Sequence, residues 1–193
     1  MNIFEKYLEL YGQIIILVLG LPCTNKSEIA KLLSKDLNIP LIKINDYIIE
    51  DEFIEKEVDG IVFKLYEHPD AFDWVKLNAD VNEAKTTGVI VYGNYINKNK
   101  IDWETDFSFF YSMNTSLCRK VLKTKKLIPH IKSEEKIKIY FEKIFNPTYE
   151  EIKTQFKINK FYNIKETTTV QESYDDIFDL LMVLIQAKLK KKL

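Results

Sequence analysis

The chain has 193 residues, of which 46% are hydrophobic and 13% aromatic, so a disordered protein is excluded and one domain with a substantial core is expected. Its 28 basic and 29 acidic residues give a net charge of −1, so no charge imbalance points to nucleic acid or an anionic membrane as a partner. The two cysteines, Cys23 and Cys118, suit a reducing compartment, and neither has metal-ligand spacing with a histidine.

The amino-terminal stretch MNIFEKYLELYGQ carries two glutamates and lacks a basic start, which argues against a signal peptide. The apolar run IIILVLGL that follows is about half as long as a membrane crossing requires. We therefore expect a cytoplasmic protein that does not cross a membrane.

Short apolar runs alternate with segments of helical periodicity, which predicts an α/β fold with a five-stranded parallel sheet flanked by helices. Strands are expected near residues 12–19, 39–45, 88–93, 106–112 and 158–164, and the first is apolar throughout, as a central strand should be. Helices are expected near residues 26–37, 70–86, 115–126, 134–156 and 171–190. No Gly-, Ser- or Pro-rich boundary divides the chain, so residues 1–193 are expected to form a single domain with 119–145 as a candidate lid.

The stretch GLPCTNKS, residues 20–27, lies between the first predicted strand of the sheet and the helix that follows. It matches the phosphate-binding pattern G-x-x-x-x-G-K-[ST], except that Asn25 stands at the second glycine. Asn is among the few residues that adopt left-handed dihedrals routinely, so the exchange is compatible with the loop. A chance match is the alternative, and the position between a buried strand and an amphipathic helix favours the functional loop.

A nucleotide site of this kind needs backbone N–H groups that face the phosphates, a cation and a hydroxyl. We expect Lys26 to reach the terminal phosphoryl group of a bound nucleotide and Ser27 to hold Mg²⁺. The predicted nucleotide-binding residues are Gly20, Leu21, Pro22, Cys23, Thr24, Asn25, Lys26 and Ser27.

Asp46 ends the second predicted strand, twenty residues after Lys26. Ligands of an open parallel sheet bind beyond the carboxyl ends of the strands, so this carboxylate would face the phosphate loop. It could accept the proton of an attacking hydroxyl group. It could equally be a helix cap in a turn, and the residues alone leave both interpretations open.

Several segments resemble the P-loop kinases of the uridine kinase and nicotinamide riboside kinase group. They are IND, which ends at Asp46, YEHPDAFD at 66–73, LCRKVLKT at 117–124, YFEKIFNPTY at 140–149 and YDDIFDLLMVLI at 174–185. The resemblance covers nearly the whole chain, and HPDAFD is its most specific part. It implies a three-layer P-loop NTPase fold with a small helical lid. It also implies transfer of the γ-phosphoryl group of ATP, with Mg²⁺, to the 5′-hydroxyl of a ribonucleoside.

The resemblance assigns roles to residues beyond the loop. Asp46 would be the general base on the 5′-hydroxyl, Glu67 would bind the ribose hydroxyls, and Tyr66 would line the base pocket. HPDAFD favours uridine or cytidine as the substrate, whereas the YFEKIFNPTY region favours nicotinamide riboside. Three lid cations, Arg119, Lys120 and Lys123, would neutralise charge on the transferring phosphoryl group. The alternative for these three is a solvated helix face.

The third predicted strand ends VIVYG, where that group commonly has VIVEG with the glutamate near Mg²⁺. Tyr92 cannot act as a carboxylate, so Mg²⁺ would rest on Ser27, phosphates and waters, with Asp46 as a further candidate. This leaves a second interpretation, a P-loop protein that binds nucleotide or nucleoside without transfer and has a regulatory or scaffold role. The joint presence of Lys26, Ser27 and Asp46 favours the enzyme, because a binding protein needs no base.

Overall fold

The computed structural model describes residues 3–22, 24–49, 54–65, 67–124 and 133–192, and its centre is a five-stranded sheet. The strand order is β2-β5-β1-β6-β7, and every neighbouring pair is parallel, so the predicted sheet is confirmed. The strands are β1 (Ile15–Gly20), β2 (Leu41–Lys43), β5 (Val89–Gly93), β6 (Phe107–Met113) and β7 (Lys160–Ile164). Every residue of β1 is buried, as expected of a strand with neighbours on both sides and helices on both faces.

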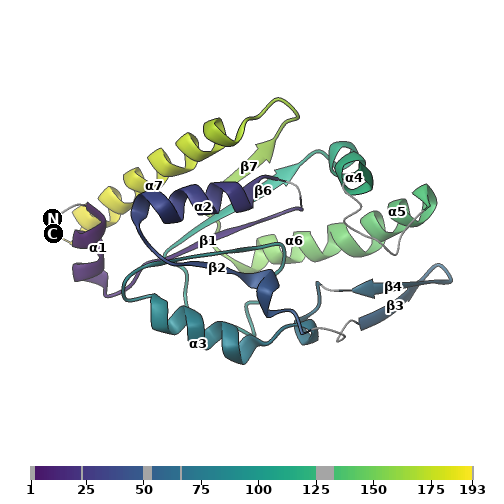
Figure 1. Ribbon diagram of the computed structural model, residues 1–193, viewed down its shortest axis with the longest axis horizontal. Coiled ribbons are helices and arrows are strands. Elements are labelled where there is room, and N and C mark those ends of the chain that lie inside the picture. Colours follow the sequence, from purple (N-terminus) through teal and green to yellow (C-terminus); the bar gives the residue numbers. More distant parts are fainter. Residues whose placement is uncertain (1–2, 23, 50–53, 66, 125–132, 193) are drawn as a thin grey trace.

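Helices cover both faces of the sheet (Figure 1). Helices α2 (Lys26–Leu37) and α7 (Val170–Lys192) lie beside each other on one face, and α3 (Trp74–Ala84) and α6 (Asn146–Gln155) lie on the other. Successive residues of β6 point to these two layers. The Tyr111 hydroxyl donates to the backbone carbonyl of Ser173 in α7, and the Phe110 ring lies 6.3 Å from that of Tyr149 in α6. The protein therefore has three layers.

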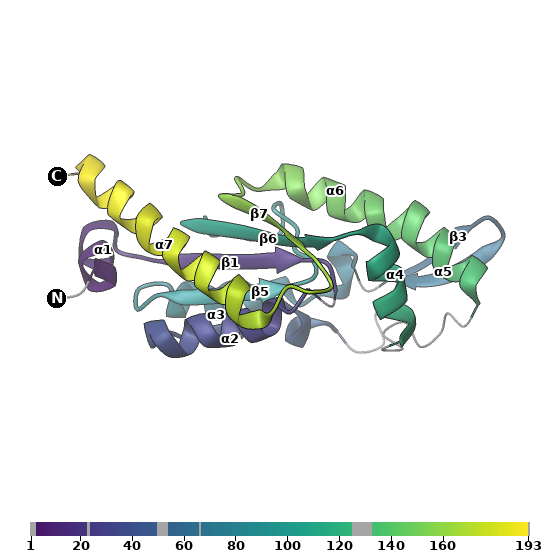
Figure 2. The same cartoon turned by 90° about the horizontal axis from the view of Figure 1, so that it is seen from above.

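The remaining elements gather at the carboxyl end of the strands, as Figures 1 and 2 show. They are α4 (Thr115–Thr124), α5 (Glu134–Tyr140), and the hairpin of β3 (Ile54–Val58) and β4 (Ile61–Leu65). Two short 3-10 helices lie nearby, η1 (Ile44–Tyr47) after β2 and η2 (Pro69–Ala71) before α3. Side chains from distant parts of the sequence are thus brought to one end of the sheet.

The β3–β4 hairpin was not predicted from the sequence. Its turn consists of Asp59 and Gly60, whose φ angles are +52° and +73°. An Asp-Gly pair with two positive φ angles is typical of a tight hairpin turn, because both residues tolerate left-handed dihedrals. The Asp-Gly dipeptide was the available signal. It was easily overlooked because the flanking residues are largely exposed and charged.

Two predicted helices have different boundaries in the structure. The helix expected at 134–156 is interrupted by a π-helical segment, η3 (Phe141–Phe145), between α5 and α6. Pro147 follows this segment, and its missing N–H prevents a regular hydrogen-bond ladder from continuing through this point. The helix expected at 70–86 begins at Trp74, because Asp73 caps it by accepting a hydrogen bond from the N–H of Lys76 at 3.0 Å.

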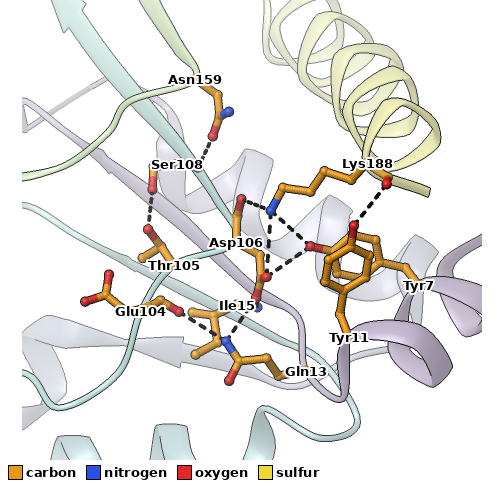
Figure 3. A network of polar contacts seen from close by, with 10 residues as sticks. All are labelled: Tyr7, Tyr11, Gln13, Ile15, Glu104, Thr105, Asp106, Ser108, Asn159 and Lys188. Atoms are coloured by element: carbon orange, nitrogen blue, oxygen red, sulfur yellow. Dashed lines mark hydrogen bonds and ion pairs between the residues drawn. The ribbon is translucent and has the colours of Figure 1, made fainter. Parts of the chain in front are cut away.

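The opposite end of the molecule is closed by a polar cluster (Figure 3), which we call the terminal clasp: Tyr7, Asp106 and Lys188. It joins α1 (Ile3–Tyr11), a helix that was not predicted, to α7. The Lys188 ammonium donates to the Tyr7 hydroxyl at 3.0 Å and to the Asp106 carbonyl at 3.1 Å, and the Tyr7 hydroxyl donates to the Asp106 carboxylate at 3.0 Å. Burial lowers the pKa of Lys188, and the Asp106 carboxylate opposes this shift.

Across the described ranges, no helix combines the length and apolar character that a membrane crossing needs.

Candidate active site

Gly20 ends β1 in close contact with the neighbouring strand. A Cβ atom at this position would lie 2.1 Å from the carbonyl oxygen of Tyr111, far inside any van der Waals contact. The N–H of Leu21 donates to the same carbonyl oxygen at 2.9 Å. The start of the phosphate loop is thus anchored to β6, and this approach requires glycine.

Asn25 closes the loop in the left-handed conformation, with φ 58° and ψ 10°, immediately before α2. Its carbonyl oxygen accepts the N–H groups of Glu28 and Ile29, both at 3.1 Å, and so begins the helix. The side-chain amide makes no capping hydrogen bond to the described residues of α2. The bend that the pattern assigns to glycine is therefore formed with asparagine, as the sequence analysis predicts.

The side chain of Lys26 is buried within the loop. Its ammonium group donates to the carbonyl oxygen of Leu21 at 2.9 Å, and the Thr24 hydroxyl donates to the same oxygen at 2.8 Å. A buried cation thus lies against the loop that is predicted to hold phosphates. Cys23, also predicted as a loop residue, lies outside the described residues.

Ser27 lies in the first turn of α2, and its hydroxyl donates to a carboxylate oxygen of Glu28 at 2.7 Å. The end of β5 lies nearby. Burial raises the pKa of the Tyr92 phenol, the Lys43 ammonium opposes the shift, and the Asp46 and Glu28 carboxylates add to it. The phenol of Tyr92 is therefore close enough to Lys43, Asp46 and Glu28 for their charges to affect its pKa.

Asp46 lies within η1, directly beyond the carboxyl end of β2. The N-cap of η1 is Lys43, so Asp46 is not the cap of this helix. Its carboxylate accepts a hydrogen bond from the Lys43 ammonium at 2.6 Å, and 63% of the Asp46 side chain is exposed. The structure thus leaves Asp46 an accessible carboxylate at the end of the sheet where the phosphate loop lies.

Glu67 lies near the phosphate loop and is hydrogen-bonded to α5. The Tyr140 hydroxyl donates to the Glu67 carboxylate at 3.3 Å. Burial raises the pKa of Glu67, and hydrogen bonds, including the one from Tyr140, together with the Lys26 ammonium oppose the shift. Sequence analysis placed Glu67 in the site but missed Tyr140, the first residue of the YFEKIFNPTY segment. Tyr66, the predicted base-pocket residue, lies outside the described residues.

Tyr140 also ties α5 to the hairpin. Its ring centroid lies 5.8 Å from that of Phe63 in β4, and the Lys143 ammonium in η3 lies 3.2 Å from the Asp59 carboxylate at the hairpin turn. Burial, followed by the Glu67 carboxylate, raises the pKa of Tyr140 well above its usual value, so Tyr140 stays a neutral hydrogen-bond donor. Tyr140, the hydrogen-bond donor to Glu67, is thus held in place by its contact with β4 and by the ion pair that joins η3 to the hairpin turn.

Two of the predicted lid cations have described side chains. Arg119, the only arginine in the sequence, lines a cavity of about 570 Å³ between α4 and α5 together with Lys120, Glu134, Glu135, Ile137 and Lys138. Lys120 also forms an ion pair with Glu166, at 3.1 Å, in the segment between β7 and α7. Lys123 lies in α4, but its side chain is outside the described part of the structure.

A second cavity, of about 510 Å³, borders the phosphate loop at Leu21. It lies between the carboxyl ends of β6 and β7 and the helix α6, and its polar lining includes Ser112, Asn114, Asn146, Lys153 and Asn163. Space for a ligand is therefore present directly beside the loop, on the face of the sheet that α6 covers.

The side chains near the loop can be tested as partners for Mg²⁺. Among the described residues, no group of three or more His, Cys, Asp or Glu side chains could hold a metal ion by itself. Mg²⁺ usually retains several waters and is held by one or two protein oxygens together with substrate phosphates. The Ser27 hydroxyl, which is hydrogen-bonded to the Glu28 carboxylate, fits an ion that arrives with a nucleotide.

No protein-family model and no curated protein matches the sequence. Solved structures do match. The chain is similar to shikimate kinase from Bacteroides thetaiotaomicron, with 19% identity, a TM-score of 0.56, and coverage of 88% of this chain and 98% of that one. It is similar to shikimate kinase from Acinetobacter baumannii, with 14% identity, a TM-score of 0.54, and coverage of 94% and 99%.

A gluconokinase from Sinorhizobium meliloti 1021 is similar at 12% identity, with a TM-score of 0.54 and coverage of 93% of this chain and 98% of that one. Likeness at such low identity concerns the fold. The chain has the three-layer α/β fold of small P-loop kinases, with a five-stranded parallel sheet between helices.

Proposed function

We propose that the chain is a kinase that transfers the γ-phosphoryl group of ATP to the 5′-hydroxyl of a ribonucleoside. The observation that carries this proposal is the loop at the end of β1, where the buried Lys26 ammonium donates to the Leu21 carbonyl. The same ammonium lies close enough to Glu67 to oppose the rise in its pKa that burial causes. The likeness to small-molecule kinases supports phosphoryl transfer. The choice of a ribonucleoside rests on the sequence resemblance, with uridine, cytidine and nicotinamide riboside as candidates.

In this proposal, Lys26 leaves the Leu21 carbonyl and binds the phosphates, while N–H groups at the start of α2 face them. Ser27 would hold Mg²⁺, which shields negative charge on the phosphates. Asp46 takes the proton of the 5′-hydroxyl, the hydroxyl oxygen bonds to the γ-phosphorus, and the bond to the bridging oxygen of ADP breaks. Asp46 is suited to this role because its carboxylate is accessible at the end of the sheet where the loop lies.

Glu67 binds the ribose hydroxyls in this proposal. As a carboxylate it can accept hydrogen bonds from two hydroxyl groups at once; burial raises the pKa of Glu67, and the Lys26 ammonium opposes that shift. Tyr140 holds Glu67 in place by its hydrogen bond from α5. Tyr66 would line the base pocket beside it. The lid cations Arg119, Lys120 and Lys123 would then neutralise charge on the transferring group.

The second candidate is a protein that binds nucleotide or nucleoside without transfer and acts in regulation or as a scaffold. The end of β5 favours it, because Tyr92 stands where a carboxylate would lie near Mg²⁺. The two candidates differ in turnover and agree in binding, so a transfer assay separates them.

The test is transfer from radiolabelled ATP to a panel of uridine, cytidine, nicotinamide riboside, shikimate and gluconate. Wild-type protein is compared with Lys26→Ala and Asp46→Asn. Labelling of a ribonucleoside that both substitutions abolish supports the proposal. Labelling that survives both contradicts the assigned site, and labelling of shikimate or gluconate alone contradicts the nucleoside substrate. Nucleotide binding without labelling of any acceptor supports the second candidate.

A further inference from the structure

The hydroxyl of Ser27 has a hydrogen-bond acceptor on the next residue of the chain. A serine that gives an oxygen lone pair to Mg²⁺ must direct its hydroxyl proton away from the ion, toward another acceptor. The Glu28 carboxylate, 2.7 Å from the Ser27 hydroxyl oxygen, already receives that proton. At the end of β5, where a carboxylate could have done so, the chain has the phenol of Tyr92.

We propose that Glu28 is a positioning residue for magnesium, which accepts the Ser27 proton and turns the oxygen lone pairs toward the ion. It thereby takes over the task of the carboxylate that is missing at position 92. This inference rests on the proposed function, because it assumes that Ser27 binds the Mg²⁺ of a nucleotide. Partners that orient a metal ligand typically contribute about 10–100-fold to metal affinity or activity.

The local structure supports this role. Glu28 lies in the first turn of α2, where its N–H donates to the Asn25 carbonyl at 3.1 Å, so the helix sets its direction relative to Ser27. Its carboxylate contributes to the raised pKa of Tyr92, and so does that of Asp46. Glu28 is therefore near both the magnesium-binding hydroxyl and the strand end that lacks a carboxylate.

A purely structural role for Glu28 makes a different prediction. An acidic side chain in the first turn of a helix is stabilising by about 0.3–1 kcal/mol through the helix dipole, whether or not a metal is present. Loss of that effect would lower the free energy of unfolding, and any change in nucleotide binding would be the same with and without Mg²⁺. Only a positioning role predicts that loss of the Glu28 carboxylate weakens nucleotide binding in the presence of metal and leaves binding without metal unchanged.

The experiment measures ADP binding by calorimetry with Mg²⁺ and with EDTA, and Mn²⁺ binding to the ADP complex by electron paramagnetic resonance. Wild type is compared with Glu28→Gln, Glu28→Asp, the double variant Glu28→Gln/Tyr92→Glu, and the exposed control Glu9→Gln on α1. We expect Glu28→Gln to weaken Mn²⁺ binding about 10–100-fold with ADP affinity in EDTA unchanged. Glu28→Asp, which shortens the reach, should also weaken it, and Tyr92→Glu should restore part of the loss.

The outcomes separate this inference from the proposed function. Wild-type protein that binds no nucleotide under either condition overturns the proposed function, and the inference with it. Wild-type protein whose metal-dependent binding is unchanged in Glu28→Gln overturns the inference alone. Equal weakening with Mg²⁺ and in EDTA also overturns it, in favour of a structural role. If thermal unfolding shows that the double variant does not fold, the two single variants decide.

Discussion

The Lys26 ammonium donates a hydrogen bond to the Leu21 carbonyl, 2.9 Å away, across the loop to which both residues belong. The Thr24 hydroxyl donates to the same oxygen. The loop is thus closed by its own cation, and a bound phosphate would compete with this carbonyl for the ammonium. If Lys26 binds phosphate as proposed, its position within the loop would reduce the entropy lost on binding.

Lys26→Ala should lower the rate of phosphoryl transfer by roughly 10²–10³, the usual cost of removing one group that stabilises charge in the transition state. The measurement is the rate of label transfer from ATP, with thermal unfolding to confirm the fold. Lys31→Ala, at an exposed position of the same helix α2, is the control. Equal rates in the two variants would contradict the assignment of Lys26.

Asn25 should tolerate glycine and reject a β-branched residue. Its φ of 58° costs an ordinary residue about 1–2 kcal/mol, so Asn25→Val should lower the free energy of unfolding by at least that amount. Asn25→Gly should leave stability within about 1 kcal/mol of wild type and preserve nucleotide binding. Urea unfolding and ADP titration measure both. A valine variant as stable as the glycine variant would show that the left-handed bend is not required.

Gly20→Ala should lower the free energy of unfolding, because the added methyl would lie 2.1 Å from the Tyr111 carbonyl oxygen. Forcing an extra group into packed structure costs about 1–3 kcal/mol or more. Gly60→Ala is the matched control, because the space around it is open and only its φ of +73° opposes the change. If the two variants unfold at the same urea concentration, the close approach of β1 to β6 is not what requires Gly20.

Asp46→Asn should separate catalysis from stability. The Asp46–Lys43 pair has side chains 63% and 47% exposed, and such surface pairs contribute only about 0–1 kcal/mol. Stability should therefore change little, while transfer should fall by about 10²–10⁴ if Asp46 is the general base. Asp73→Ala, which removes the oxygen that caps α3, offers the reverse pattern, with stability lower by about 0.5–2 kcal/mol and unchanged transfer. An Asp46 variant with full transfer would exclude it as the base.

Glu67 should give the stability a recognisable pH dependence. Burial raises its pKa above the usual value of 4.5, so the folded chain keeps a proton that the unfolded chain releases. Stability from this group is complete below about pH 4.5 and is lost as the pH rises through the folded pKa. The free energy of unfolding of Glu67→Gln, relative to wild type, should therefore increase with pH.

Urea unfolding between about pH 4 and pH 8 measures this difference. Glu57→Gln, at an exposed position of β3, is the control for the substitution itself. A Glu67→Gln difference that stays constant with pH would contradict the shifted pKa.

The central sheet could be predicted from the sequence because its strands are short apolar runs bounded by helical periodicity. The loop could be predicted because its spacing is strict and Asn25 has a known backbone preference. The role of Tyr140 could not be predicted, because Tyr140 and Glu67 are 73 residues apart in the sequence and only the tertiary fold brings them together. The π-helical interruption of the predicted helix at Phe141–Phe145 was not predicted for another reason. The apolar periodicity continues through this segment, and Pro147 is the only residue that indicates a break.

The terminal clasp has a practical consequence. It fixes the first and last helices to each other at the end of the molecule remote from the phosphate loop, and the Lys192 ammonium adds a bond to the Leu10 carbonyl at 2.6 Å. A purification tag or surface linker attached to either terminus would extend away from the phosphate loop. Such immobilised protein should retain nucleotide access, which makes surface-based kinetic measurements feasible with either orientation.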